Sequence, residues 1–203
     1  MSSRHDTGWD RIYHRCLPEQ LPWELGRPRR VLVELVDSGG VVPGNTLDLC
    51  CGAGTNPVYL AKKGFKVTAL DISKKAVLYA RDKACEAKVS IDFVVGNFLD
   101  LPFKSAEFDF AFDFGCFHHV EVKDRATFIR GVYGVLKPKG TYFLACFSYR
   151  NGAAWNHFRK EQILGLFHDC FEIKWIKHVS SIEGDKVRRY FYEVLMEKRV
   201  CIF

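Results

Sequence analysis

The sequence has no run of apolar residues long enough to cross a membrane, although 48% of its residues are hydrophobic. Its first ten residues, MSSRHDTGWD, also lack the apolar stretch of a secretory signal peptide. These two absences argue against a membrane protein and against a secreted one. We therefore expect a cytoplasmic protein that has no membrane partner.

Metal-binding motifs are absent as well. The chain has eight cysteines, but none forms a C-x-x-C pair and none has the paired spacing of a zinc site, so we expect no bound metal. Cys50 and Cys51 are adjacent in a motif that needs its own backbone geometry, which makes them poor disulfide candidates. Thiols at this density suit a reducing compartment.

The positive charges lack the clustering of a nucleic-acid-binding protein. The net charge is +6, but Lys and Arg are scattered along the chain rather than gathered into one stripe or tail with interleaved aromatic residues. The pattern argues against a nucleic-acid partner. A length of 203 residues fits one α/β domain better than two, and it leaves open whether that domain is a monomer or a homodimer.

Short apolar strands alternate with helices along most of the chain. This alternation predicts an α/β fold with a mostly parallel sheet covered on both faces, and the last two strands predict an antiparallel pair at one edge. Ser73 is a candidate N-cap for the longest helix, Pro138 and Gly140 predict a turn, and residues 180–185 predict the final turn. The predicted strands are 45–49, 65–70, 91–95, 108–112, 141–147, 171–178 and 187–197, and the predicted helices are 31–36, 57–63, 74–87, 124–136 and 160–167.

A glycine-rich turn follows the first predicted strand, in the sequence LDLCCGAGTN (residues 47–56). Gly52 and Gly54 allow the backbone to approach a ligand closely and tolerate a positive φ. Asp71 ends the second predicted strand, where a carboxylate in a Rossmann-type unit accepts hydrogen bonds from ribose hydroxyls. The alternative for Asp71 is a helix cap before Ser73. Taken together, the turn and Asp71 predict a ligand that contains adenosine.

The residues around the turn favour a ligand other than a dinucleotide. A dinucleotide site has a third glycine, but Pro57 stands near that position. Asp48, which precedes the turn, suits an ammonium group better than a pyrophosphate.

The motifs in this order resemble those of class I S-adenosylmethionine-dependent methyltransferases. The segment from Asp48 to Gly54 is similar to their motif D-x-G-x-G-x-G, with Cys50 at the first glycine position. The resemblance implies a Rossmann-like, seven-stranded sheet in the order 3-2-1-4-5-7-6, with S-adenosyl-L-methionine as cofactor and S-adenosyl-L-homocysteine as product. The cofactor-binding residues that we expect are Trp23, Asp48, Cys50, Gly52, Gly54, Thr55, Asn56, Asp71, Ile72, Asn97, Phe98 and Phe114.

A narrower resemblance concerns two further segments. The sequence DFGCFHH (residues 113–119) resembles the D-R-G-C-F-H segment of the thiopurine, thiol/halide and tellurite-resistance methyltransferases, with Phe114 in place of the arginine. The sequence LPWELGRP (residues 21–28) is similar to their N-terminal motif, which folds over the cofactor. The resemblance implies a lid formed by residues 1–30 and a methyltransferase domain formed by residues 31–203.

The acceptor site is expected at the carboxyl ends of the fourth and fifth strands. The substrate residues that we expect are Tyr13, Phe117, His118 and His119. His118 is the candidate catalytic residue, either as a base or as a group that orients the acceptor, and the alternative is a histidine that only packs in the loop. Few charges are visible near these positions, which favours a small, soft or weakly polar acceptor such as a thiol or an amine. The other two hypotheses are a protein or RNA methyltransferase, and a member that binds the cofactor without turnover.

Overall fold

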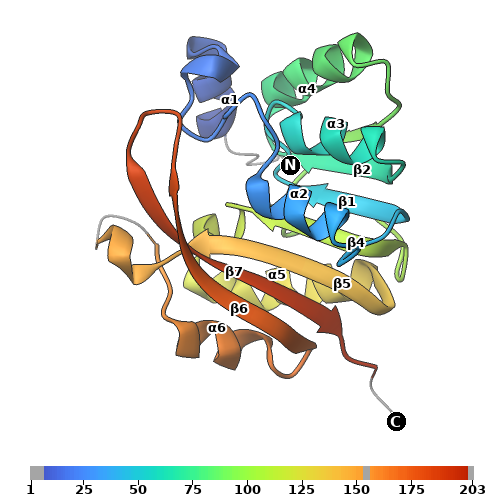
Figure 1. Cartoon of the computed structure of the whole chain (residues 1–203), viewed down its shortest axis with the longest axis vertical. Coiled ribbons are helices and arrows are strands. Elements are labelled where there is room, and N and C mark those ends of the chain that lie inside the picture. The colour runs from blue at the N-terminus through green and yellow to red at the C-terminus, as the bar shows by residue number, and fades with distance from the viewer. Residues whose placement is uncertain (1–6, 153–155, 201–203) are drawn as a thin grey trace, which may run out of the picture.

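The computed structural model describes residues 7–152 and 156–200 of the chain. Their strands form one sheet in the order β3-β2-β1-β4-β5-β7-β6 (Figure 1). Neighbours among β1 to β5 pair in parallel, whereas β7 pairs antiparallel with both β5 and β6. The predicted fold class and strand order are confirmed. The strands are β1 (Asn45–Leu49), β2 (Lys66–Asp71), β3 (Asp92–Val95), β4 (Phe108–Phe114), β5 (Leu136–Phe147), β6 (Phe171–Ile182) and β7 (Arg188–Lys198).

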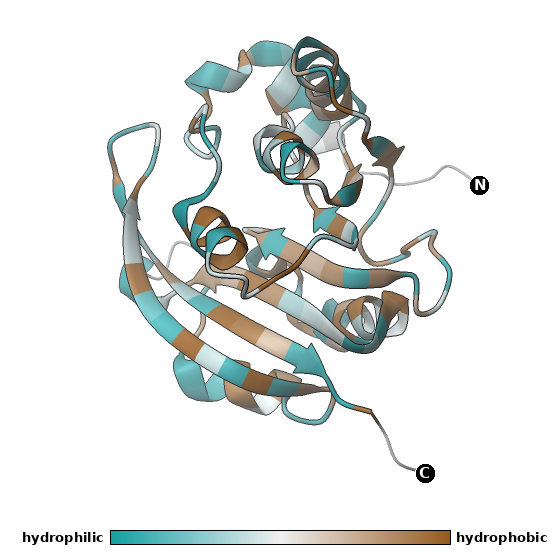
Figure 2. Ribbon diagram, turned by 45° about the vertical axis from the view of Figure 1, so that its right-hand side comes forward, coloured by the Kyte–Doolittle hydropathy of each residue, from teal (hydrophilic) through white to brown (hydrophobic). Residues whose placement is uncertain are grey.

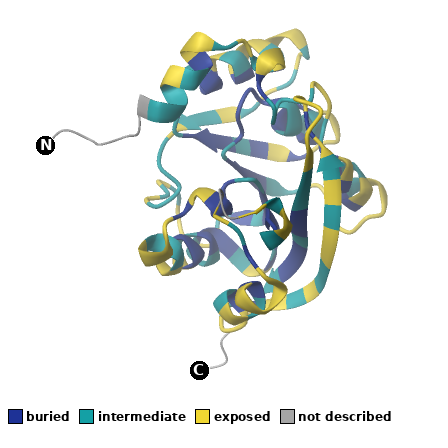
Figure 3. Cartoon of the chain, turned by 90° about the vertical axis from the view of Figure 1, so that its left-hand side faces the viewer, coloured by how far each residue is buried: buried dark blue, intermediate teal, exposed yellow. Residues whose placement is uncertain are grey.

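Helices cover both faces of the sheet because strand side chains alternate in direction. Leu47 and Ala111 belong to the apolar cluster that includes α5 and α6, whereas Phe110 and Phe112 belong to the cluster that includes α2 and α3. Apolar residues line the inner strands (Figure 2), and those strands are buried while the helices expose their outer faces (Figure 3). The α-helices are α1 (Thr7–Arg15), α2 (Arg30–Asp37), α3 (Thr55–Lys62), α4 (Lys74–Glu86), α5 (Arg125–Val135) and α6 (Lys160–Phe167).

One predicted turn lies inside a strand, and another overlaps the end of a strand. The predicted turn at Pro138 and Gly140 is a bulge within β5, because Leu136 already pairs with Phe108 and the regular register resumes at Thr141. The predicted turn at residues 180–185 begins too early, because β6 continues to Ile182 and pairs with β7 along its length. In β5 the residues between Leu136 and Thr141 have no described partner in β4, as in a bulge, whereas Ser180, Ser181 and Ile182 pair with β7 although polar residues are common in turns.

Gly54 begins α3 and fixes how closely that helix packs on α4. Its φ is +84°, and a Cβ atom at this position would lie 2.7 Å from the Cβ of Ala80 and 2.8 Å from its Cα. Only glycine accommodates both the positive φ and this contact. The turn after β1 is therefore held against α4 as well as against the sheet.

The N-terminal segment folds back onto the domain. Asp10, in α1, accepts hydrogen bonds from the Ser73 hydroxyl and from the Lys75 N–H, both at 2.8 Å. The predicted cap is confirmed, since Ser73 Oγ accepts from the Ala76 N–H. Tyr13 and Leu21 are buried in the same small apolar cluster. Helix α1 thus lies across the N-terminal end of α4.

Among the described residues, no helix is long and apolar enough to span a membrane.

Candidate functional site

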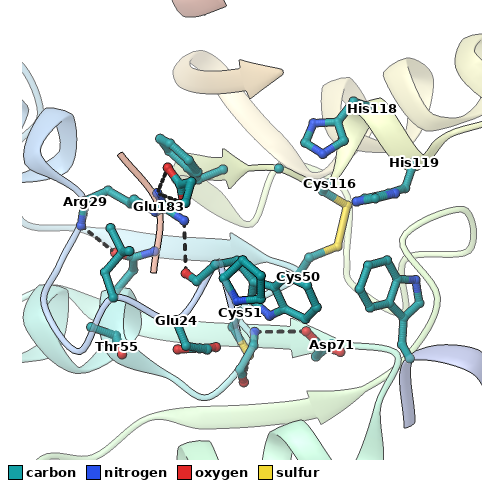
Figure 4. A pocket seen from close by; sticks show the side chains of 18 of the residues that line it. Glu24, Arg29, Cys50, Cys51, Thr55, Asp71, Cys116, His118, His119 and Glu183 are labelled. Atoms are coloured by element: carbon teal, nitrogen blue, oxygen red, sulfur yellow. Dashed lines mark hydrogen bonds and ion pairs between the residues drawn. A yellow bond between two sulfur atoms is a disulfide. The ribbon is translucent and has the colours of Figure 1, made fainter. Parts of the chain in front are cut away.

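A cavity of about 520 Å³ lies at the carboxyl ends of β1, β2 and β4 (Figure 4). Its wall is built from the N-terminal segment, the glycine turn (residues 50–54), the loop after β4 and the β6–β7 hairpin. Parallel strands of an open α/β sheet commonly place ligands at this edge. The cavity is lined by these sequence-predicted residues: Tyr13, Trp23, Cys50, Gly52, Thr55, Asn56, Asp71, Ile72, Phe98, Phe114, His118 and His119.

Asp71 lies at the end of β2 with its carboxylate at the cavity wall. One oxygen accepts from the Gly52 N–H at 2.9 Å and the other from the Ser73 N–H at 2.8 Å. Burial raises the pKa of Asp71 to about 6, against these two hydrogen bonds, which lower it. The carboxylate is thus fixed in place and still faces the cavity.

Gly52 lies beneath two side chains of the N-terminal segment. A Cβ on Gly52 would lie 2.5 Å from Glu24 Oε1 and 2.9 Å from the Tyr13 hydroxyl. The same Glu24 oxygen accepts from the Ala53 N–H at 2.7 Å. The Tyr13 hydroxyl accepts from Trp23 Nε1 at 2.9 Å and donates to Glu24. Glycine is required here because the backbone and the carboxylate are in direct contact.

Asp48 is buried beneath the glycine turn and lies outside the cavity wall. Its Oδ2 has no hydrogen-bond partner among the described residues. Burial, followed by the nearby charges of Asp113, Asp71 and Glu24, raises the pKa of Asp48 well above its usual range. Four carboxyl groups therefore gather at the turn, and a cationic ligand would relieve their mutual repulsion. A phosphate would increase it.

Three other predicted residues also lie outside the cavity wall. Gly54 packs on α4, and Asn97 Oδ1 accepts from the Leu99 N–H within its own loop. Phe117 was expected to line the acceptor site, but it is fully buried and stacks on Phe158, with ring centroids 5.1 Å apart. The expectation was wrong because the short 3-10 helix that contains Phe117 turns its ring into the core.

His118 lies at the cavity wall and is 5% exposed. Its ring stacks on Phe147 with centroids 3.8 Å apart, and its Nδ1 accepts from the Phe147 N–H at 3.3 Å. Burial, followed by the neighbouring His119, lowers the pKa of His118 well below its usual range. The ring is therefore neutral at pH 7. Because Nδ1 accepts a hydrogen bond, the ring proton lies on Nε2.

His119 is exposed at the same wall, and its ring meets Trp9 of α1 edge-on, with centroids 4.9 Å apart. Trp9 was not among the residues predicted from sequence.

The side of the cavity next to Phe114 contains more charge than the sequence predicted. Arg29 is 8% exposed, and its guanidinium donates to both carboxylate oxygens of Glu183 at 2.9 and 3.0 Å. It also lies 4.0 Å from the ring centroid of Phe114. Arg189 lines the wall as well and pairs with Asp185. Sequence reasoning missed these groups because Arg29 and Glu183 are 154 residues apart and neither belongs to a recognisable motif.

The expectation that Cys50 is a poor disulfide candidate was wrong. Cys50, in the glycine turn, and Cys116, in the loop after β4, form a disulfide at the cavity wall (Figure 4). The expectation considered only the local backbone of residues 50 and 51. The partner comes from the loop of the neighbouring strand, 66 residues away, with the two Cα atoms 5.8 Å apart. Among the described residues, no group of side chains has the arrangement of a metal site.

Comparisons with known proteins point to one family. Residues 46–140 match the model of the methyltransferase domain family. An uncharacterized methyltransferase of Schizosaccharomyces pombe is 33% identical over 107 residues, which cover 53% of this chain and 74% of the relative. Another, from Synechocystis, is 39% identical over 105 residues, so the chain spans about half of that protein, 48% of its length. The 2-heptyl-1-hydroxyquinolin-4(1H)-one methyltransferase of Mycobacteroides abscessus is 27% identical over 140 residues, 66% of this chain and 61% of the relative.

Solved structures share the whole fold at low sequence identity. One is described as "Conversion of a Disulfide Bond into a Thioacetal Group during Echinomycin Biosynthesis", with a TM-score of 0.84 and 21% identity over 95% of this chain and 91% of that chain. Another is the Burkholderia thailandensis 1,6-didemethyltoxoflavin-N1-methyltransferase with bound 1,6-didemethyltoxoflavin and S-adenosylhomocysteine. Its TM-score is 0.69, at 19% identity over 84% of this chain and 78% of that chain.

Proposed function

Because the chain belongs to the methyltransferases and its methyl donor is S-adenosylmethionine, we propose that it methylates a small, planar molecule at a nitrogen or sulfur atom. One observation carries the proposal: the donor and acceptor ends of the cavity have different chemistry. Carboxyl groups gather at the glycine turn, whereas aromatic rings line the side next to β4, β5 and β7. A cationic donor suits the first end and a flat acceptor suits the second.

The residues at the turn fit the donor. Asp71 would hold the ribose hydroxyls, and the acidic groups of Asp48 and Glu24 favour the positive charges of the sulfonium and the ammonium. Trp23 and Tyr13 cover the turn from the N-terminal segment, which supports a lid that excludes water. When bound, S-adenosylmethionine supplies a methyl group that its sulfonium already activates. The protein's own task is to align the acceptor with that group.

Aromatic rings form a wall at the proposed acceptor end. Phe191 lies between Phe114 and Phe147, with ring centroids 5.2 Å from each, and His118 stacks on Phe147. Stacked and tilted rings at these distances suit a planar guest. The Arg29–Glu183 salt bridge lies at this end, and the two opposite charges neutralise each other. A phosphate-rich polymer finds no unpaired cluster of positive charge among the residues that line the cavity.

We expect His118 to orient the acceptor by donating from Nε2 rather than to act as a base. Its neutral ring has no free lone pair on that nitrogen, because Nδ1 is the acceptor for the Phe147 N–H. Replacing His118 by Ala should lower kcat about tenfold, the effect of about one lost hydrogen bond. The affinity for S-adenosylhomocysteine should stay within about twofold, since the lost bond is worth well under 1.4 kcal/mol to that ligand.

Phe is the matched control at this position. His118→Phe keeps a flat ring against Phe147 but removes the donor, so it should lose as much activity as His118→Ala if donation is the role. The loss should be equal at pH 6 and pH 8, because the ring is neutral at both. A loss of about 10²–10⁴-fold would instead indicate general base catalysis.

Asp71 makes the binding of the donor product dependent on pH. The pKa of Asp71 is about 6, so its carboxylate is ionised above pH 6 and is the better acceptor for ribose hydroxyls there. Affinity for S-adenosylhomocysteine should therefore be highest at pH 7–8 and fall as the pH drops through about 6. Isothermal titration calorimetry between pH 5 and pH 8 measures this change.

Variants of Asp71 test whether this residue causes the pH dependence of S-adenosylhomocysteine binding. Asp71→Ala should weaken binding at pH 8 by about 1–3 kcal/mol, or roughly 5- to 150-fold. Asp71→Asn should bind weakly with a flattened pH profile. An Asp71→Asn protein whose profile matches that of the wild type would place the titrating group elsewhere.

A methyl-transfer screen with labelled donor tests the proposal. The acceptors are heterocyclic amines, aromatic thiols, aliphatic thiols, phenols, halides and metalloid oxyanions. We expect turnover with a planar nitrogen or sulfur acceptor, and the quinolone and toxoflavin methyltransferases similar to this chain support that class. Labelling of bulk RNA or protein with no small acceptor would overturn it. Donor binding without turnover on any acceptor would indicate a binding-only member.

The match of residues 21–28 and 113–119 to the thiopurine, thiol/halide and tellurite-resistance groups supports a place near them. The cytoplasmic location, which cell fractionation measures, and a monomer or homodimer are proposed on the sequence alone.

A further inference from the structure

The disulfide at the cavity wall joins the two loops that bound the donor end. Cys50 follows β1 and Cys116 follows β4, and these strands are hydrogen-bonded neighbours in the sheet. The Cα–Cα distance of 5.8 Å lies within the range that a disulfide needs.

Backbone hydrogen bonds fix both loops independently of the sulfur atoms. The Cys51 N–H donates to the Leu70 carbonyl at 3.0 Å, and the Cys116 N–H donates to Asp113 Oδ1 at 2.8 Å. The neighbouring Gly115 N–H donates to the Ala145 carbonyl. The two cysteines are thus held within reach of each other by the sheet, so forming or breaking the S–S bond requires little movement of the backbone.

Cys50 differs from its neighbours at the cavity wall in its access to small molecules. Cys50, Cys51 and Cys116 all line the cavity, but Cys50 is partly exposed to it, whereas Cys51 and Cys116 are buried. Cys51 and Cys146 are buried, and burial raises the pKa of both thiols well above the usual range, which makes them poor nucleophiles. Cys85 is exposed but lies outside this cavity, on α4. A small oxidant in the cavity therefore meets Cys50 first.

We propose that Cys50 and Cys116 are a reversible oxidative modification site, with a hydroperoxide as oxidant, and that their disulfide stabilises the donor-binding form of the cavity. The Cys50 sulfur attacks hydrogen peroxide, the O–O bond breaks, and a sulfenic acid and one water form. The Cys116 sulfur then attacks the sulfenic sulfur, the S–S bond forms and a second water leaves. Two thiols lose two electrons and two protons, and one peroxide becomes two waters. A dithiol reductant reverses the change by thiol–disulfide exchange.

Donor binding and the disulfide should favour each other. The disulfide ties the glycine turn to the loop that contains Cys116, and both line the cavity next to Asp71. A ligand that fills the cavity restrains the same two loops. Coupling between two sites is reciprocal, so the oxidised protein should bind S-adenosylhomocysteine about tenfold more tightly than the reduced one. S-adenosylhomocysteine should shift the thiol–disulfide equilibrium toward the disulfide by the same factor. This coupling rests on the proposed function, whereas the existence of the pair does not.

The experiment uses the whole chain in glutathione buffers of graded redox ratio. Free thiols are alkylated, and non-reducing peptide mapping measures the fraction of the Cys50–Cys116 link with and without S-adenosylhomocysteine. Calorimetry measures the affinity for S-adenosylhomocysteine in the oxidised and the reduced protein. We expect the Cys50–Cys116 link to form without ligand, to reverse with dithiothreitol and to increase with S-adenosylhomocysteine.

Two variants complete the design. Cys85→Ser should keep the full redox response, whereas Cys116→Ser should bind S-adenosylhomocysteine equally in both buffers. If Cys116→Ser does not fold, the wild-type mapping still decides the question. Absence of the Cys50–Cys116 link in oxidised, folded protein would overturn the modification site. A link with no change in affinity would overturn the coupling. A protein that forms the link but never binds S-adenosylhomocysteine would refute the donor assignment and the coupling while leaving the modification site standing.

Discussion

A protein that begins at Arg29 should bind S-adenosylhomocysteine at least about 100-fold more weakly than the full chain, a loss of about 2.7 kcal/mol. The deletion removes Tyr13, Trp23 and Glu24 from the cavity wall. The Tyr13 hydroxyl is hydrogen-bonded to both Trp23 and Glu24, and Glu24 accepts from the Ala53 N–H in the glycine turn. Several hydrogen bonds of about 0.5–1.5 kcal/mol and an aromatic cover are lost together. Arg29 is retained so that Glu183 keeps its partner.

Calorimetry gives the affinity, and circular dichroism shows whether the shortened protein folds. Deleting only residues 1–6 leaves α1 whole and should keep the affinity close to that of the full chain. A folded protein beginning at Arg29 with full affinity would rule out a lid in the N-terminal segment. If the shortened protein does not fold, Trp23→Ala and Glu24→Ala in the full chain test the same contacts singly.

Replacing Glu183 by Ala should lower the free energy of unfolding by about 3–5 kcal/mol. The Arg29 and Glu183 side chains are 9% and 3% exposed, so solvent screens the pair little. Removing the carboxylate leaves the guanidinium buried, with the Trp23 carbonyl as its remaining acceptor among the described residues. The large cost comes from this uncompensated charge rather than from the strength of the pair.

Urea unfolding measures the loss, and two comparisons identify its cause. The double variant Arg29→Met with Glu183→Leu removes both charges and should recover most of the stability. Asp185→Ala breaks the exposed pair with Arg189 on the same hairpin and should change stability far less. An equal loss in Glu183→Ala and the double variant would show that packing, not charge, is responsible.

The sheet was predictable because its local signals agree with its packing. Strands such as β1 are short apolar runs, and both the glycine turn and Asp71, which the sequence predicted as site residues, line the cavity. The bulge in β5 was not predictable, because Pro138 and Gly140 have the composition of a turn and only pairing with β4 extends the strand through them.

The side of the cavity next to β4, β5 and β7 was harder to predict because it depends on distant residues. His118 was found from the sequence DFGCFHH, but the direction of Phe117 depends on a single 3-10 turn. Glu24, Arg29 and Glu183 come together only after folding, and the partner of Cys50 lies on another strand's loop. A local pattern contains no information about such contacts.

The contact between the N-terminal segment and the β6–β7 hairpin has a consequence for biosynthesis. The Gly184 N–H donates to the Pro22 carbonyl at 2.8 Å, and Glu183 binds Arg29, so the cavity is closed by residues from opposite ends of the described chain. Ribosomes add about 5–20 residues per second, so Glu183 is synthesised roughly 8–30 s after Arg29. During that interval the residues of β1 and of the glycine turn are synthesised, but Pro22 and Arg29 still lack their partners on the hairpin. We therefore expect a nascent chain that has not yet reached Glu183 to bind the donor more weakly than the folded protein, because part of the cavity wall is absent.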